Sequence, residues 1–439
     1  MSRKRKQRPN IPKKNKNEAE SKPFRQAVAR QYPLWTYAAV FALLALVSLI
    51  LYYNILHAPF VFDDTINIRD KAGIHVKTVS ELFGVFSDET IEKRRVGYFT
   101  FALNFLIGGL DTFGYHLTNV LIHILSGCLV FWLVLTTLTL PKANRADLFQ
   151  KTEADNRSLI LAIAFFSTLI WLVHPVQTQA VSYIVQRFAG LAALFFLSSF
   201  AFYIAGRLTA GNYKYVFFAA SVLCGILAMG VKQNTAVLPF LLFIYELCFF
   251  HDSPWDALKK RWLALAGLLI FLALITLLYL GPGLWTILKE GFELRPFTMT
   301  ERLITESRVI WLYLSLIVLP LPSRLNVDYD FAFSKSVFDP PTTFLSIILI
   351  AGILIFALVR AKKQPFLSFS ILWFFGHLVI ESSILPLDLV HEHRLYLASL
   401  GPITIITAFV ILKTKTRNMY AAPVILAIIV IVFGVWTHE

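Results

Sequence analysis

The chain has 439 residues, of which 57% are hydrophobic and 15% are charged, and its formal net charge is +14. Soluble globular proteins carry about 25% charged residues, so this composition excludes that class and predicts an all-α polytopic membrane protein. Much of the positive charge lies near the N-terminus, in a segment with few apolar residues. We therefore predict a disordered basic tail over residues 1–33, which stays in the cytoplasm and contacts anionic membrane lipids. No aromatic residues alternate with its basic residues, so nucleic acid is not predicted as a partner.

Residues 34–439 are predicted to form one transmembrane domain. Spanning helices need about 20 apolar residues, and the chain contains about eleven such segments, the first of them too long for a cleaved signal peptide. Basic clusters near residues 259–261, 360–363 and 413–417 belong in the cytoplasm, which places the N-terminus inside and the C-terminus outside. The predicted spans are residues 34–56, 115–138, 159–173, 188–204, 215–231, 236–250, 262–280, 342–359, 366–385, 395–412 and 420–436.

This parity leaves two large external loops, residues 57–114 and 281–341. Each loop contains an apolar segment, residues 96–110 and 303–319. The first segment is short, and the second contains Glu306 and Arg308. We expect both to be interfacial or re-entrant helices and not full spans.

An acidic pair, Asp63 and Asp64, lies directly after the first span in the sequence FVFDD. Burial beside the membrane raises the pKa of a carboxyl group, and a second negative charge raises it further. A carboxylate in these conditions is a competent general base. The alternative is that the two aspartates only cap a helix that begins at Thr65.

Many of the other unusual ionisable groups lie at the predicted outer ends of the helices. Charged groups at membrane depth are costly and tend to mark functional sites. Several cations beside two acids suit an anionic phosphate ligand, whereas the alternative is that these long side chains only reach towards water. The candidate lipid-phosphate or donor-binding residues are Arg94, Arg95, His174, Arg187, Lys232, Glu392, His393 and Arg394.

The sequence His391-Glu392-His393-Arg394 also raises the question of a metal ion. Residues at positions i and i+2 of a helix point apart, and the ligand set is incomplete. We therefore assign no metal ligands, and a divalent metal is a disfavoured alternative. A phosphate-facing pair, His393 and Arg394, with Glu392 as an orienting partner is the preferred interpretation.

Five motifs occur in order along the chain: FVFDD, RRVGYFTFALNFLIGGLDTFGYHLTNVLIH, LVHPVQTQAVSYIVQR, KQN and LPLDLVHEHRLYLASLG. From about residue 50 to 405 the set resembles the membrane region of the transmembrane O-mannosyltransferases that carry tetratricopeptide repeats, and their bacterial relatives. These enzymes belong to the GT-C class of glycosyltransferases, which use polyprenyl-phosphate sugars. The resemblance implies a GT-C-like fold with its active site on the external face.

The resemblance also implies roles for individual residues. Asp63 matches the catalytic base, with Asp64 as its neighbour, and four basic residues fall at motif positions that face the lipid phosphate. These are Arg187, Lys232, His393 and Arg394. The chain departs from the family pattern at Gln177, Gln179 and Gln233, where the family places His, Glu and Glu. The repeats are absent, so we expect the acceptor to be recognised differently.

We therefore predict an inverting glycosyltransferase that moves a sugar from a polyprenyl-phosphate donor to a hydroxyl of a protein, glycan or lipid acceptor, as in protein glycosylation. The favoured location is a bacterial plasma membrane, with the site on its external, periplasmic face. The alternatives are a non-catalytic membrane protein, a transporter-like protein, and a glycan ligase with a diphosphate-linked donor. The enzyme hypothesis requires Asp63 and Arg394 to converge at one face of the molecule.

Overall fold

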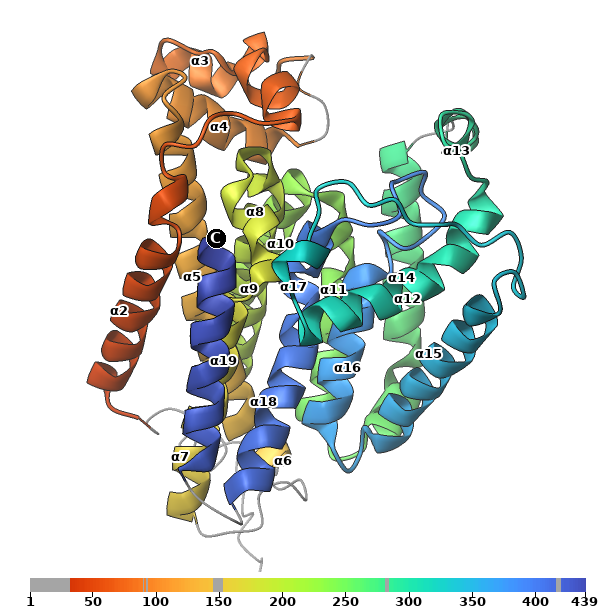
Figure 1. Ribbon diagram of the computed structural model, residues 1–439. Helices are drawn as coiled ribbons and strands as arrows, with labels where there is room; N and C mark the ends of the chain where they lie inside the picture. The colour runs from red at the N-terminus through yellow and green to blue at the C-terminus, as the bar shows by residue number, and fades with distance from the viewer. Residues whose placement is uncertain (1–31, 90, 92–93, 145–152, 281–283, 416–419) are drawn as a thin grey trace, which may run out of the picture.

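The computed structural model describes residues 32–89, 91, 94–144, 153–280, 284–415 and 420–439, and all regular secondary structure in these ranges is helical (Figure 1). The predicted disordered tail lies almost entirely outside the described residues. Six helices are long and apolar enough to cross a membrane, and up to eight spans result if each of two bent helix pairs is one span. The protein is therefore an integral multi-pass membrane protein. The six helices are α2 (Leu34–Leu51), α5 (Thr112–Thr139), α9 (Arg187–Leu208), α10 (Tyr213–Val231), α15 (Pro341–Arg360) and α19 (Ala421–His438).

The remaining five predicted spans coincide with helices that are bent, short or interrupted. Two belong to the bent pairs: α7 (Glu153–Leu172) precedes a bend of 53°, and α18 (Leu400–Lys415) follows a bend of 56°. The helices α11 (Leu238–Phe249) and α16 (Pro365–Leu378) have 12 and 14 residues, and thus fall short of the roughly 30 Å hydrocarbon core at 1.5 Å per residue. The helix α12 (Pro254–Leu280) has a non-helical residue at Arg261. The count of six to eight candidate spans is thus lower than the eleven predicted from hydropathy.

The first large loop folds into a small helical layer at one end of the helix bundle. It contains η2 (Thr65–Arg69), η3 (Ala72–Ile74), α3 (Val79–Gly84) and α4 (Arg95–Gly108), and Figure 1 shows α3 and α4 beyond the upper end of α2. The helix α4 covers the apolar segment predicted at residues 96–110. A Cβ atom on Gly97 would lie 2.4 Å from the ring of Phe188, so this glycine permits the close approach of α4 to α9.

The second large loop contains α13 (Leu284–Glu293), α14 (Met299–Val318) and η7 (Pro322–Arg324). The helix α14 covers the segment predicted at residues 303–319, and it is not among the candidate spans. A capping box formed by Thr298 and Glu301 starts this helix. In Figure 1 α14 is inclined across the neighbouring helices, while α13 lies at the same end of the molecule as α3 and α4.

The two bent pairs meet in the core and bring distant parts of the chain together. The first bend leads into η4 (Pro175–Gln177), α8 (Thr178–Ser182) and η5 (Ile184–Gln186), and the second follows η8 (Glu392–Arg394) and α17 (Leu395–Ala398). The indole of Trp171 donates to the carbonyl of Tyr396 at 2.8 Å, and the amide of Gln177 donates to the hydroxyl of Ser399 at 3.2 Å. A Cβ atom on Gly401 would lie 2.2 Å from the carbonyl oxygen of Ser370, so α18 packs directly on the backbone of α16.

Candidate functional site

The carboxylate of Asp64 fastens the first loop to the segment that follows the first bend. It is 1% exposed and accepts the backbone N–H groups of Val185 at 2.7 Å and Val61 at 3.1 Å. A short helix does begin at Thr65, but the Asp64 side chain makes no capping bond to it. Burial raises the pKa of Asp64 to about 6, and the negative charge of Asp63 adds to this effect while the backbone donors oppose it.

The side chain of Asp63, by contrast, is exposed to solvent. Its backbone N–H donates to the hydroxyl of Tyr183 at 2.7 Å, and its carboxylate has no hydrogen bond or ion pair to any other residue that the structure describes. The preceding residue, Phe62, has a φ of 44°. A phenylalanine in this left-handed region is strained, and such strain is stored preferentially at functional sites. The loop thus presents Asp63 in a fixed position with a free carboxylate.

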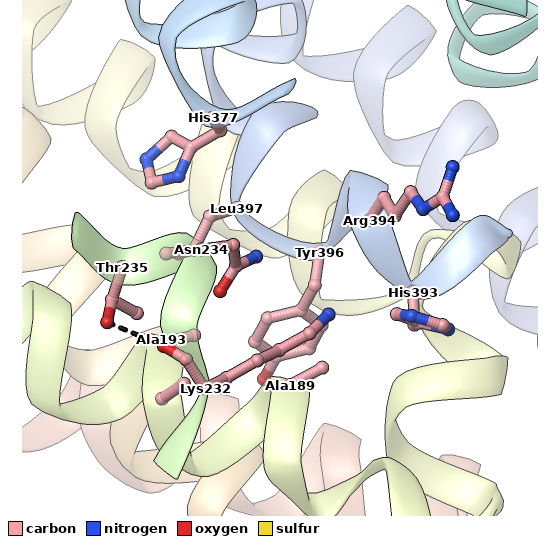
Figure 2. Close-up of a pocket in the computed structure, with 11 residues that line it drawn as sticks. Ala189, Ala193, Lys232, Asn234, Thr235, His377, His393, Arg394, Tyr396 and Leu397 are labelled. Carbon is pink, nitrogen blue, oxygen red and sulfur yellow. Dashed lines mark hydrogen bonds between the residues drawn. The ribbon is translucent and has the colours of Figure 1, made fainter. Parts of the chain in front are cut away.

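The predicted cation Lys232 lines a pocket formed where α9, η6 (Gln233–Val237), α16 and α17 meet (Figure 2). The pocket is small, with about 20 Å³ of space for the centres of water molecules. The ammonium of Lys232 lies 2.7 Å from a carboxylate oxygen of Glu381, and the other oxygen of Glu381 accepts the amide of Asn234 at 3.1 Å. The lining residues are Ala189, Ala192, Ala193, Lys232, Asn234, Thr235, His377, His393, Arg394, Tyr396 and Leu397.

The side chain of His393 faces Lys232 from the opposite wall of this pocket (Figure 2). The side-chain amide oxygen of Gln179 accepts two hydrogen bonds from His393. One comes from the backbone N–H at 2.7 Å and the other from the ring Nδ1 at 3.0 Å. Nδ1 therefore carries the proton, and in the neutral ring Nε2 is an acceptor. The glutamine that departs from the family pattern thus orients the histidine.

Arg394 and Glu392 bind neighbouring loops on either side of His393. Two nitrogens of Arg394 donate to the carbonyls of Leu389 and Asp388, at 2.8 and 2.7 Å, while its Nε is buried and lacks a hydrogen-bond partner among the described residues. Glu392 is 4% exposed and accepts the Tyr329 hydroxyl at 2.5 Å and the N–H of residue 326 at 2.7 Å. Glu392 thus anchors the second large loop.

The two adjacent arginines of the first loop differ in their surroundings. The guanidinium of Arg94 lies 5.0 Å from the ring centroid of Phe188, and its charge acts on both Lys232 and His393. Arg95 is exposed, and its Nε is 3.5 Å from the carbonyl of residue 91. Only Arg94 therefore joins the cations around the pocket.

Two other predicted phosphate-binding residues are held by the protein itself. All three guanidinium nitrogens of Arg187 are engaged, with the carbonyls of Thr100 and Tyr115 and the side chains of Asn104 and Asn119 as acceptors. Because Arg187 is 1% exposed, it fixes α4 to α5 and α9 instead of facing a free ligand position. The geometry therefore corrects the sequence-based expectation for Arg187.

His174 requires the same correction. Its ring is fully buried, with Nε2 2.9 Å from the carbonyl of Ile317, and its Nδ1 accepts the N–H of Val176 at 3.3 Å. The histidine thus joins the end of α7 to the end of α14. It does not line the pocket.

The acidic pair and the wall of the cationic pocket both contact the short segment formed by α8 and η5. Asp64 binds the backbone of Val185, and His393 binds the side chain of Gln179, so only a few residues of α8 and η5 separate the two groups. Neither Asp63 nor Asp64 is among the residues that line the pocket. Both groups therefore contact the segment between Gln179 and Val185.

Sequence reasoning left Glu381, Asn234 and Tyr183 out of the site. The signal for Glu381 was present, since an acid in an apolar stretch at membrane depth is rare. Its partner Lys232 is distant in sequence, however, and only the packing of η6 beside α16 pairs them. Among the residues that the structure describes, no three His, Cys, Asp or Glu side chains are grouped to hold a metal ion.

Comparison with known proteins gives matches to animal protein O-mannosyltransferases. The chain is 28% identical over 227 residues to Protein O-mannosyl-transferase Tmtc3 of Drosophila melanogaster, which covers 48% of the chain and 24% of that relative. It is 30% identical over 227 residues to Protein O-mannosyl-transferase TMTC1 of Mus musculus, covering 48% and 22%. With Protein O-mannosyl-transferase F38B6.6 of Caenorhabditis elegans the identity is 24% over 334 residues, covering 71% of the chain and 41% of the relative.

The chain thus spans less than half the length of each of these three relatives. No family model and no solved structure matches it. The resemblance predicted from the five motifs is confirmed: the chain is distantly similar to protein O-mannosyltransferases.

Proposed function

We propose that the protein is a GT-C-type glycosyltransferase that moves one sugar from a polyprenyl-phosphate donor to a hydroxyl of an acceptor. The names of its relatives favour mannose as the sugar and a protein as the acceptor. A multi-pass membrane protein suits a donor whose long apolar chain stays in the bilayer. The proposed site consists of Asp63 and the neighbouring cationic pocket.

The observation that carries this proposal is an excess of buried positive charge around the pocket. Of the described residues that line the pocket, two are buried cations, Lys232 and Arg394, and none is a carboxylate. Glu381 pairs with Lys232 from beside the pocket, and the buried Glu392 binds Tyr329. The charge of Arg94 adds to the excess from the first loop. Burying an uncompensated charge is costly, and an anionic group in the pocket would offset that cost. A lipid phosphate supplies such a group.

In the proposed reaction the acceptor oxygen attacks the anomeric carbon from the side opposite the phosphate, which inverts its configuration. The bond between the acceptor oxygen and the carbon forms while the bond between the carbon and the phosphate oxygen breaks. Asp63 takes the hydroxyl proton, because its carboxylate is free and its backbone is fixed by Tyr183. Lys232 and Arg94 stabilise the charge that develops on the leaving phosphate.

The other predicted residues support this arrangement. Asp64 holds the loop that carries Asp63, and Gln179 orients His393 in the pocket wall. Arg394 contributes its charge and its free Nε. Arg187, which the sequence placed at the phosphate, is assigned instead to holding α4 against the bundle.

We further propose that all eleven apolar segments cross the membrane, with the short and bent helices completed by their neighbours. In Figure 1 α3, α4 and α13 lie at the upper end of the molecule, and α6 (Pro141–Asn144) lies at the lower end. Lys142 of α6 donates to the carbonyl of His251, close to the basic residues 259–261. Basic residues favour the cytoplasmic side, so the candidate site faces outward, from a plasma membrane in the favoured case.

The test is transfer by the purified protein in lipid vesicles. Polyprenyl-phosphate mannose with a labelled sugar is supplied with Ser/Thr-rich peptides in one series and with glycolipids in another, with and without EDTA. We expect label to appear on the acceptor with wild-type protein and to be lost with Asp63→Asn. Transfer only from a diphosphate-linked donor, or movement of the donor across the bilayer without transfer, would overturn the proposal.

A further inference from the structure

Glu381 lies just past the end of α16 and has no part in the proposed chemistry. It is 5% exposed, and one of its carboxylate oxygens lies 2.7 Å from the ammonium of Lys232. The side-chain amide of Asn234 donates to the other oxygen at 3.1 Å. The backbone carbonyl of Glu381 accepts a guanidinium nitrogen of Arg302 at 2.7 Å. Both the backbone and the carboxylate of Glu381 are therefore held in place, and the carboxylate is directed at the Lys232 ammonium.

The Lys232 ammonium needs such a partner. Burial lowers the pKa of Lys232, and the positive charges of Arg94 and Arg394 lower it further, while Glu381 opposes them. Burial on its own would raise the pKa of Glu381, but Lys232 and Arg394 hold the pKa of this carboxyl below its usual range. His393 also faces Lys232, and Glu381 interacts electrostatically with His377 and Glu306. The ion pair thus keeps both of its members charged.

The pairing leaves the ammonium able to bind a ligand. An ammonium has three N–H donors, so a single carboxylate contact leaves donors for the oxygens of a phosphate. Figure 2 shows the Lys232 side chain extending through the pocket towards His393, so these donors face the pocket interior. His377, in the same lining, stacks on the rings of Phe196 and Trp373.

We propose that Glu381 is a positioning residue that holds the Lys232 ammonium charged and directed at the donor phosphate. This inference rests on the proposed function. It states that Glu381 determines the upper limit of the pH range over which the donor is bound. A lysine in this pocket without its carboxylate would lose its proton at a lower pH. Donor binding would then fail at a pH where the wild-type protein still works.

The experiment is the pH profile of the KM for the polyprenyl-phosphate sugar, with the acceptor saturating. For Glu381→Gln we expect the rise of KM on the alkaline side to move about 1–3 units to lower pH, since a neighbouring opposite charge shifts a pKa by that amount. Adding Lys232→Arg should restore the alkaline side, because a guanidinium keeps its proton. Glu290→Gln, an exposed carboxylate of α13, is the matched control and should leave the profile unchanged.

Two outcomes would overturn the inference. One is a Glu381→Gln profile that coincides with the wild-type profile, and the other is an equal loss at every pH that Lys232→Arg does not relieve. If Glu381→Gln does not accumulate in membranes, Asn234→Ala tests the same pair, with a smaller shift expected in the same direction. Absence of transfer by the wild-type protein would refute the proposed function itself, so the two failures are distinguishable.

Discussion

Two clusters of charge lie at opposite ends of α11, and they look alike in sequence. At the N-terminal end, η6 (Gln233–Val237) leads from Lys232 and its partner Glu381 into the helix. Near the other end the buried Glu246 accepts two nitrogens of Arg207, each at 2.9 Å, together with Tyr203 at 2.8 Å. Each cluster places a buried acid beside basic residues at the boundary of an apolar helix.

The clusters differ in how far water reaches their cations and in what is left unpaired. Around Glu246 the side chains of the cations are partly exposed, 34% for Arg207 and 46% for Arg261, so water solvates them. Around Lys232 the side chain is 9% exposed, a pocket opens beside it, and the Nε of Arg394 has no partner among the described residues. Charge at membrane depth therefore does not by itself mark a site. We propose that buried cations beside a pocket mark the site.

The largest expected effect is for Asp63→Asn, in the loop beside the Lys232 cluster. Loss of a general base lowers the rate about 10²–10⁴-fold, and the exposed side chain contributes few contacts, so the variant should fold normally. Single-turnover transfer of labelled sugar measures the loss, and the melting temperature in detergent serves as the control. Activity within a few-fold of wild type would remove Asp63 from the mechanism.

Next in size is the comparison of Lys232→Gln with Arg207→Gln. Removal of a group that stabilises developing charge lowers kcat by about 10²–10³-fold, so Lys232→Gln should lose most transfer. Arg207→Gln lies in the other cluster and should retain the turnover of wild type once the amount of folded protein is equalised. Equal loss in both variants would erase the distinction between the two clusters.

Glu246→Gln should affect stability and not turnover. Removing one member of a buried ion pair costs about 3–5 kcal/mol, and the solvated cations around Glu246 place the expected loss near the lower limit. The melting temperature in detergent should fall, while kcat per folded molecule stays constant. A fall in kcat with an unchanged melting temperature would show that the cluster around Glu246 also takes part in the reaction.

The smallest effect concerns Asp64, whose pKa is raised to about 6 from 3.8. A carboxyl group with a raised pKa binds its proton more tightly in the folded state, so its contribution to stability falls as the pH rises from about 4 to about 6. The shift corresponds to at most about 3 kcal/mol. Melting temperatures across this range should fall in the wild-type protein and fall less in Asp64→Asn. Parallel profiles would contradict the raised pKa.

The membrane class, the helical structure and the presence of helices at α4 and α14 could all be predicted from the sequence, because apolar length and charge placement are local properties of the chain. The number of candidate spans could not be predicted from the sequence. Hydropathy detects apolar segments, but the bends that follow α7 and precede α18 depend on how those segments pack.

The same limit applies to the site. As sequence, Arg187 and Lys232 are equivalent basic residues at helix ends, and only tertiary packing distinguishes them. Asn104 and Asn119 occupy the guanidinium of Arg187, whereas Lys232 meets a single carboxylate and a pocket. Which residues carry charge is written in the chain. Which of those charges stay available to a ligand depends on the acceptors that folding brings within hydrogen-bonding distance.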